Sequence, residues 1–306
     1  MEENAAVQAK PKKKKRHQFL FVLFMTVFLM LAGQGLGTAI VYPFLSRVKD
    51  GGWLFLLEIY AVFAGIVILA TAYTFLFEKE IFRSYLWPSA GGPASNNPKM
   101  LGLGLFAGFL VNVLCAASAF VAGDLDFSFG TFDALYLLGA LLLIFVQSSA
   151  EELLTRGYLY MSIRERYGRI AGLILNSSLF MALHLGNPGV TSLSLLNLFL
   201  WGAVCTLIVE YTGSMWFVMA AHTAWNFTQN ILLGLPNSGI VSPRSLLHLE
   251  AASDGLMYSA LFGIEGGLPA VVFLAALCVL LIAYRDRIRA IYGTAAVSEI
   301  KENSNV

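Results

Sequence analysis

Long apolar segments constrain this chain more than any other feature of its sequence. Of the 306 residues, 58% are hydrophobic and only 13% are charged, and the mean hydropathy is +0.71. This composition is typical of a polytopic membrane protein and excludes an ordinary soluble domain. An apolar run of about 17 to 25 residues can cross the hydrocarbon as a helix, so the chain predicts an all-α bundle of about eight transmembrane helices. The predicted helices cover residues 18–44, 53–77, 100–122, 134–150 (running on through the glutamates at 151 and 152), 170–185, 193–209, 214–235 and 268–284.

The first apolar run follows a basic segment, an order that also occurs in cleaved signal peptides. Lys10 and residues 12–16 are all basic. The run over residues 18–44 is longer than the roughly 7 to 15 residues of a signal-peptide core, and it shows no convincing A-x-A-like cleavage site. We therefore expect a retained first transmembrane helix.

The placement of Lys and Arg predicts the orientation of the chain. Eight crossings put both termini on one side of the membrane. Of the 20 Lys and Arg residues, 17 fall on that side, and only Arg47, Lys49 and Arg244 fall on the other. Because basic residues concentrate on the cytoplasmic side, both termini are predicted to be cytoplasmic. The expected residence is a bacterial inner membrane, with the endoplasmic reticulum as the alternative.

Strongly polar residues interrupt three successive apolar segments. Each ionised group costs roughly 2.5 to 3.5 kcal/mol at the centre of a transmembrane helix, so such residues need a reason. They combine carboxylates, imidazoles and an amide, which is the composition of a hydrolytic site. The residues are Glu151, Glu152, Arg156, His184, His222 and Asn226.

The two adjacent glutamates are expected to face different surroundings. Glu152 and Arg156 are four residues apart, so they are neighbours on a helix and can form an ion pair. Glu151 is rotated from Glu152 by about 100 degrees and cannot be satisfied by the same contact. Gln147 lies one turn before Glu151, which predicts a polar cavity at this end of the helix. On a soluble helix an EExxxR string is commonly a surface salt bridge, so the string alone does not identify a site.

The other two polar segments each carry one histidine. Phe180 precedes His184 by one turn, which places an aromatic ring beside the imidazole. His222 and Asn226 are also one turn apart, so both project from one face of their helix. Taken singly, each group is compatible with hydrogen bonding between packed helices. Their joint occurrence favours a shared site.

These residues form three motifs that together resemble those of a known family. The motifs are EExxxR at residues 151–156, FxxxH at residues 180–184 and HxxxN at residues 222–226. In this order, on successive apolar helices, they resemble the CAAX protease and bacteriocin-processing family of intramembrane endopeptidases, also called the Abi or type II CAAX prenyl endopeptidase family. The resemblance covers roughly residues 134–235, about a third of the chain.

The resemblance also implies a role for each motif residue. It implies that Glu151 is the general base that activates water, and that His184 holds or polarises that water. It further implies that His222 and Asn226 donate hydrogen bonds to the oxyanion that develops on the scissile carbonyl. The residues in supporting roles would be Glu152, Arg156 and Phe180.

Cofactor use stays open at this stage. An alternative view of the family treats the carboxylate and the imidazoles as zinc ligands, which here would be Glu151, His184 and His222. Two imidazoles and a carboxylate are a known catalytic zinc set. The HExxH string of other membrane zinc proteases is absent, and the three cysteines lie in different apolar runs without CxxC spacing. No cofactor is certain, and zinc is the alternative.

The composition and the motifs predict four parts of the chain. The segment over residues 88–98 is rich in Gly, Pro, Ser and Asn and is expected to be a flexible loop. The long outer segment over residues 236–267 is expected to lie at the interface or to cap the bundle. The parts are a basic cytoplasmic tail (1–17), peripheral transmembrane helices with the loop (18–99), a catalytic transmembrane bundle (100–284, with the motif region at 134–235) and a cytoplasmic C-terminal tail (285–306).

The expected function is hydrolysis of a peptide or protein substrate, which includes membrane-associated or lipidated ones, by glutamate-activated water in a membrane cavity. Membrane lipid is the other expected partner, and no nucleic-acid footprint occurs beyond the N-terminal lysines. One alternative is a non-catalytic peptide-binding or bacteriocin-immunity protein of the membrane. The other is a proton-coupled transporter, which would predict inverted repeats that the sequence does not display.

The predicted depths of Glu151 and His184 in the membrane conflict with their sharing one site. If the fourth helix ends just after the two glutamates, Glu151 lies near the cytoplasmic end, whereas His184 lies about 21 Å beyond Ile170, counting 1.5 Å per residue. The conflict disappears if the fourth helix continues past Arg156, if the fifth begins earlier, or if the helices tilt. We expect residues 156–169 to be partly helical and to shape the cytoplasmic mouth of the cavity.

Overall fold

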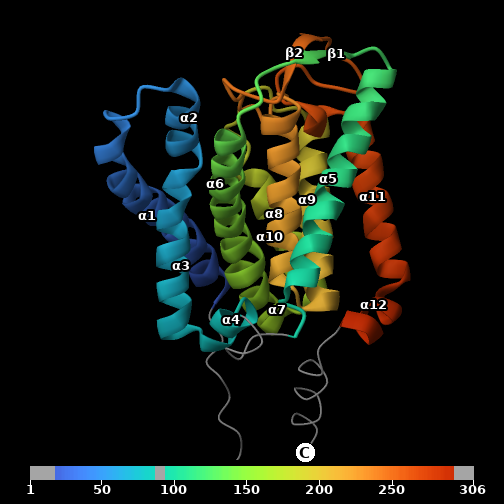
Figure 1. Cartoon of the computed structure of the whole chain (residues 1–306). Coiled ribbons are helices and arrows are strands. Elements are labelled where there is room, and N and C mark those ends of the chain that lie inside the picture. Colours follow the sequence, from blue (N-terminus) through green and yellow to red (C-terminus); the bar gives the residue numbers. More distant parts are fainter. Residues whose placement is uncertain (1–17, 87–93, 293–306) are drawn as a thin grey trace, which may run out of the picture.

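The computed structural model describes residues 18–86 and 94–292, which are mostly helical (Figure 1). The prediction of an all-α membrane bundle is confirmed, apart from one small sheet. Three predicted regions lie wholly or partly outside the described residues: the basic tail, the flexible loop and the C-terminal tail.

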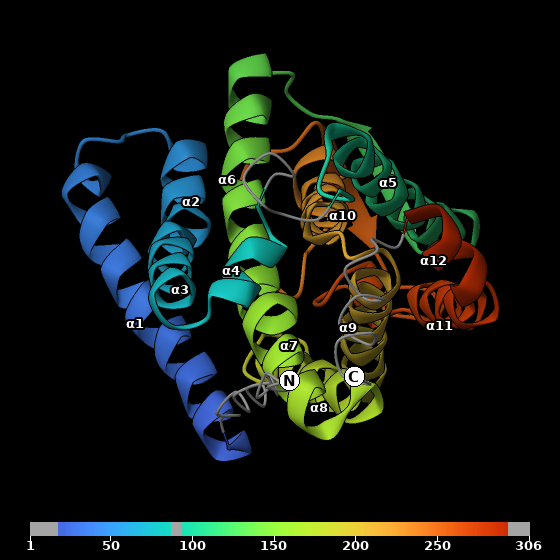
Figure 2. The same ribbon diagram turned by 90° about the horizontal axis from the view of Figure 1, so that it is seen from below.

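The N-terminal helices lie together at one side of the molecule (Figures 1 and 2). α1 and α3 pack along each other, and both also contact the neighbouring bundle. α2, η1 and α3 continue one another over Gly51–Phe77 as one apolar span, close to the predicted range of 53–77. The elements are α1 (Phe19–Leu45), α2 (Gly51–Ile59), the 3-10 turn η1 (Ala61–Phe63), α3 (Ala64–Phe77) and α4 (Lys79–Ser84).

The remaining helices form a bundle around α10, which packs against α5, α6 and α9 (Figure 2). η3 and η4 are π-helical continuations of α6 and α10. The elements are α5 (Pro98–Val121), α6 (Ala134–Glu152), η3 (Leu153–Tyr160), α7 (Met161–Tyr167), α8 (Arg169–Ala182), α9 (Ser192–Thr212), α10 (Met215–Phe227), η4 (Thr228–Leu232), the 3-10 turn η5 (Ile264–Gly266), α11 (Leu268–Ala283) and α12 (Arg285–Tyr292).

Polar caps define where several of these helices begin. The side chain of Asn97 accepts a hydrogen bond from the Met100 N–H, and that of Asp133 accepts one from the Tyr136 N–H. Thr191 forms a capping box at the start of α9. Such caps satisfy N–H groups that have no partner within the helix. The observed starts of α5, α6 and α9 are therefore within two residues of the predicted ones.

The fourth predicted helix includes the two glutamates, as predicted, and continues beyond them. α6, η3 and α7 form one helical run over Ala134–Tyr167. The Thr155 hydroxyl donates to the Glu151 carbonyl oxygen over 2.6 Å, a bond that competes with the regular helical pattern where the π-helical segment begins. Glu151 therefore lies well inside a long helix, which removes the conflict of depth with His184. Arg156, counted among the basic residues of the cytoplasmic side, is instead fully buried.

Five helices of the described chain are long and apolar enough to cross a membrane, or six if the bent pair α11 and α12 counts as one span. The chain is therefore an integral membrane protein. Every segment predicted to cross contains a helix, but the count of eight crossings is not confirmed. α8 has only 14 residues, and α10 has 13 residues before it turns π-helical.

The two ends of the bundle differ in what they carry. The first turn of α1 and all of α12 lie at the same end as α4 and α7 (Figure 1). At the opposite end Arg244 pairs with Asp50 at 2.6 Å and with Asp133 at 3.2 Å. Which end faces the cytoplasm stays a prediction.

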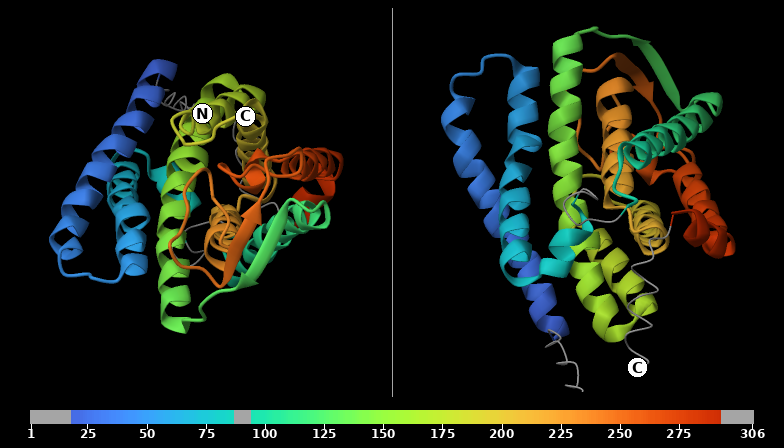
Figure 3. Two further views of the ribbon diagram at one scale, coloured as in Figure 1. Left: turned by 90° about the horizontal axis from the view of Figure 1, so that it is seen from above. Right: turned by 60° about the horizontal axis from the view of Figure 1, so that its bottom comes forward.

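A two-stranded antiparallel sheet crosses that opposite end, where no strand was predicted. β1 (Leu125–Phe129) pairs with β2 (Leu247–Ala252). Seen from above, the sheet and its flanking loops lie across the ends of the helices (Figure 3). The outer segment that follows η4 therefore lies over the bundle, and part of it is a strand because it pairs with the loop before α6.

Candidate active site

A cavity of about 240 Å³ lies between the N-terminal helices and the bundle. One wall comes mainly from α1, η1 and α3 and is mostly apolar, with Thr26, Gln34 and Tyr60 as its polar members. The other wall carries the motif residues. All four residues expected to be catalytic line this one cavity, together with Phe180; they are Glu151, His184, His222 and Asn226.

Glu151 is the glutamate that reaches the cavity. Its side chain is 21% exposed, whereas that of Glu152 is fully buried. Its Oε1 accepts a hydrogen bond from Gln147 Nε2 over 2.6 Å. Its Oε2 lies 3.8 Å from His222 Nε2 and accepts no hydrogen bond from any described group. One oxygen of Glu151 is thus held by a hydrogen bond, and the other is buried without a hydrogen-bond partner among the described residues.

Glu152 is buried between the guanidinium of Arg156 and the imidazole of His222. Its Oε1 lies 3.1 Å from Arg156 Nη1 and 2.9 Å from His222 Nδ1. The predicted contact of Glu152 with Arg156 is therefore present. The guanidinium of Arg156 also lies over the ring of Phe180, 4.5 Å from its centre. A buried charge is tolerated only when it is paired, so these contacts keep the two charges inside the bundle.

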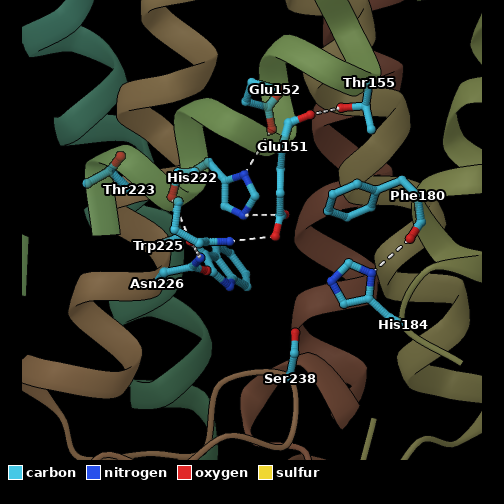
Figure 4. A network of polar contacts seen from close by, with 12 residues as sticks. Glu151, Glu152, Thr155, Phe180, His184, His222, Thr223, Trp225, Asn226 and Ser238 are labelled. Carbon is cyan, nitrogen blue, oxygen red and sulfur yellow. Dashed lines mark hydrogen bonds and ion pairs between the residues drawn. The ribbon is translucent and has the colours of Figure 1, made fainter. Parts of the chain in front are cut away.

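His184 lies across the cavity from Glu151 (Figure 4). It occupies the turn directly after α8, and its ring centre is 4.8 Å from that of Phe180. Its Nδ1 lies 2.8 Å from the Phe180 carbonyl oxygen. A carbonyl only accepts, so Nδ1 carries a proton, and in the neutral ring Nε2 holds a lone pair.

The imidazole of His222 lies between the two glutamates, with one ring nitrogen toward each. Nδ1 contacts Glu152, and Nε2 faces Glu151 (Figure 4). The rings of Trp201 and Phe180 pack against the imidazole at centre distances of 5.6 and 6.1 Å. These contacts hold the ring in place at the cavity wall.

Asn226, one turn after His222, belongs to a chain of amide groups. Its Nδ2 donates to Gln147 Oε1 over 3.0 Å. Its Oδ1 accepts from Asn237 Nδ2 over 3.2 Å. The orientation of the Asn226 amide is therefore fixed on both sides.

Comparison with known proteins agrees with the motifs and their placement. Residues 133–228 match a family model described as type II CAAX prenyl endopeptidase Rce1-like, and this stretch contains all three motifs. This stretch, about a third of the chain, is a domain of this family. No curated protein and no solved structure matches it. The domain supports a CAAX-protease-like membrane endopeptidase, a hydrolase that acts on a peptide or protein.

The zinc ligands considered for this CAAX-protease-like chain do not form a group. Within residues 18–86 and 94–292, no three His, Cys, Asp or Glu side chains are placed so that they could hold one metal ion. His184 is separated by the cavity from Glu151 and His222, and Nδ1 of each imidazole already has a protein partner (Figure 4). The residues present do not fit the zinc site.

The sequence analysis missed a second set of polar residues at the cavity of this CAAX-protease-like chain. Asn237, Ser238 and Glu265 line it from the outer segment. Glu265 is buried, and burial raises its pKa, against hydrogen bonds from Ser238 and Trp225 and the charge of His184. One signal was present in the sequence, because Glu265 is the only charged residue between Asp254 and Arg285.

Proposed function

We propose that the chain cleaves an amide bond of its substrate with a water molecule that Glu151 activates inside the cavity. The observation that carries this proposal is the state of the Glu151 carboxylate. The side chain lines the cavity; its Oε1 is held by Gln147, while Oε2 lies 3.8 Å from His222 Nε2 and accepts no hydrogen bond from a described donor. Glu152 is a poorer candidate because it is fully buried against Arg156 and His222.

His184 is suited to orient the water. Its Nδ1–H is engaged by the Phe180 carbonyl oxygen, which leaves Nε2 as a hydrogen-bond acceptor in the neutral ring. A water in the cavity would donate one hydrogen to Glu151 and the other to His184. Its lone pair would then be directed at the scissile carbonyl.

His222 and Asn226 are suited to stabilise the oxyanion. Nδ1–H of His222 donates to Glu152, so donation from Nε2 requires a second proton on the ring. In that state the positive charges of His222 and Arg156 cancel the negative charges of the two glutamates. Asn226 has one N–H bonded to Gln147 and a second one available to the cavity. Such donors gain strength where water is excluded.

The reaction then proceeds in two proton transfers. As the water oxygen bonds to the carbonyl carbon, Glu151 takes a proton from it and the carbonyl oxygen becomes an oxyanion. When the intermediate collapses, the C–N bond breaks and Glu151 gives the proton to the leaving nitrogen. The products are a carboxyl group and an amine, and Glu151 returns to the carboxylate form.

The opposite wall of the cavity bears on the kind of substrate. Val27, Met30, Phe63 and Ile66 line it and are all apolar. A peptide bound between this wall and the motif residues would place apolar groups against α1 and α3. We therefore infer that the substrate is membrane-associated or lipidated rather than a freely soluble polar peptide.

The test is cleavage of a mixed peptide library by the protein purified in detergent, read by mass spectrometry. Wild type, Glu151→Gln and His222→Ala are compared with and without a chelator. We expect wild type to cut under both conditions and Glu151→Gln to be inactive. Cleavage that a chelator abolishes would assign the water to a metal instead. Binding of peptides by folded wild-type protein without any cleavage would support a sequestering function.

A further inference from the structure

A run of three amide side chains connects Glu265 to Glu151. Asn237 Nδ2 donates to Asn226 Oδ1 over 3.2 Å, and Asn226 Nδ2 donates to Gln147 Oε1 over 3.0 Å. Gln147 Nε2 then donates to Glu151 Oε1 over 2.6 Å. These three bonds point the same way, with each amide donating toward Glu151.

The direction of this run matters for the proposed chemistry. An amide group has two N–H donors at one end and only an acceptor at the other, so a flipped amide reverses its neighbours. In the observed direction, Asn226 directs its N–H groups toward Gln147 and the cavity. In the reversed direction, the Asn226 oxygen would lie there instead and would repel a developing oxyanion.

Glu265 fixes the start of the run, because an ionised carboxylate only accepts hydrogen bonds. Its Oε1 accepts from Trp225 Nε1 over 2.9 Å and from Asn237 Nδ2 over 3.4 Å. Asn237 must therefore turn its N–H₂ group toward Glu265, and the same group reaches Asn226. An acceptor at position 265 thus sets which end of each following amide is the donor.

The same carboxylate also holds the backbone of the loop. Glu265 Oε2 accepts from the N–H of Ser238 over 2.6 Å and from its hydroxyl over 2.7 Å. Among the described residues other than glycine, Ser238 alone has a positive φ, of 47°. Such a conformation is uncommon for a residue with a side chain and persists only when its surroundings hold it. Ser238 also points into the cavity (Figure 4).

We propose that Glu265 is a positioning residue: it orients Asn237, and through it the amide run that directs Asn226 and Gln147 at the reacting groups. Glu265 and Asn237 lie outside the stretch that matches the family and outside the three motifs. This proposal rests on the proposed function, since the role of Asn226 as an oxyanion donor comes from there.

Two substitutions of nearly equal shape test the proposal by kinetics. Asn237→Asp replaces the donor group with an acceptor, so Asn226 is expected to flip. Glu265→Gln replaces one carboxylate oxygen with an NH₂ group, which then faces the N–H donors of Trp225, Asn237 or Ser238. Loss of an oxyanion donor lowers kcat roughly 100-fold to 1000-fold, and both variants are expected to approach the lower end of this range, with KM changed less than about twofold. The matched control is Glu250→Gln, a carboxylate on β2 at the same end of the molecule that bonds only Ser128 among the described side chains.

A second measurement does not depend on activity. The protein is labelled with [15N]asparagine, and the side-chain signal of Asn226 is assigned by its loss in Asn226→Asp. We expect Asn237→Asp and Glu265→Gln to shift the Asn226 signal, and Glu250→Gln to leave it in place. If wild type cleaves nothing, the proposed function fails, and this signal still decides whether the amide run exists.

Three results would overturn the proposal. The first is an unchanged Asn226 signal in both variants. The second is wild-type kcat in both variants. The third is a lower thermal midpoint with normal kcat for the folded fraction, which would assign Glu265 a merely structural role.

Discussion

The N-terminal helices and the motif-bearing bundle are held together by different means. α1 and α3 meet at glycines: a Cβ on Gly37 would overlap the Val62 carbonyl oxygen, and a Cβ on Gly65 would overlap the Gly33 carbonyl oxygen. The bundle has close glycine contacts too, but it also buries charged and amide side chains that bond from helix to helix.

The difference shows what the buried polar groups are for. Lipid tails are as apolar as leucine, so close packing of small residues is sufficient to hold two membrane helices together. α1 and α3 demonstrate this with few polar contacts. Polar groups in the bundle therefore need another explanation, and they concentrate around the cavity where hydrolysis is proposed. The predictions below separate packing from chemistry in the two regions.

The largest effect on stability is expected in the bundle for Arg156→Met. This change leaves the buried Glu152 carboxylate without its cation, a loss that typically costs roughly 3 to 5 kcal/mol. Denaturant unfolding in detergent measures it. The control is Arg83→Met, because Arg83 and Glu80 are both mostly exposed and such pairs contribute at most about 1 kcal/mol. Equal losses in the two variants would contradict the account.

A smaller effect is expected for Gly108→Ala, which overpacks the contact between α5 and α10. The added Cβ would overlap the carbonyl oxygen of Ala221, the residue before His222. Overpacking typically costs about 1 to 3 kcal/mol, and here it also displaces the helix that carries the oxyanion donors. Both the unfolding midpoint and kcat should fall. Gly102→Ala is the control, since its Cβ meets no atom within 4 Å.

The corresponding change in the N-terminal pair is Gly37→Ala. It should cost a similar free energy of unfolding, about 1 to 3 kcal/mol, while kcat of the folded protein stays near that of wild type. Gly35→Ala is the matched control, because a Cβ there also meets nothing within 4 Å. A fall in kcat as large as that of Gly108→Ala would remove the distinction between the two regions.

The smallest effect is expected from metal removal. Because the described His, Cys, Asp and Glu side chains provide no set of three that could hold a metal ion, a chelator should change the cleavage rate less than about twofold. Peptide cleavage before and after dialysis against the chelator measures this. Restoration of a lost activity by added zinc would contradict the prediction.

The sequence predicted the helices better than the site. Apolar runs and caps located the helix starts, and the three motifs located residues that do meet at one cavity. The continuation of the helix beyond Glu152 was left open by the sequence, because burial of Glu152 and Arg156 depends on contacts with His222 and Phe180 from other helices.

The contribution of the outer segment could not be read from the sequence. Helical periodicity relates residues within one helix, but Asn237 and Glu265 reach Asn226 only through the fold of a loop. The sheet was missed for the same reason, since β2 is a strand only because β1, more than a hundred residues earlier, pairs with it.

The most direct test compares the two adjacent glutamates by measuring the peptide cleavage rate and the thermal midpoint of Glu151→Gln and Glu152→Gln. The account predicts that Glu151→Gln loses cleavage by roughly 1000-fold or more with an unchanged midpoint. Glu152→Gln should lower the midpoint, because Arg156 loses its partner, and should retain more activity than Glu151→Gln. Wild-type cleavage by Glu151→Gln, or loss of cleavage in Glu152→Gln alone, would contradict the assignment of Glu151 as the base.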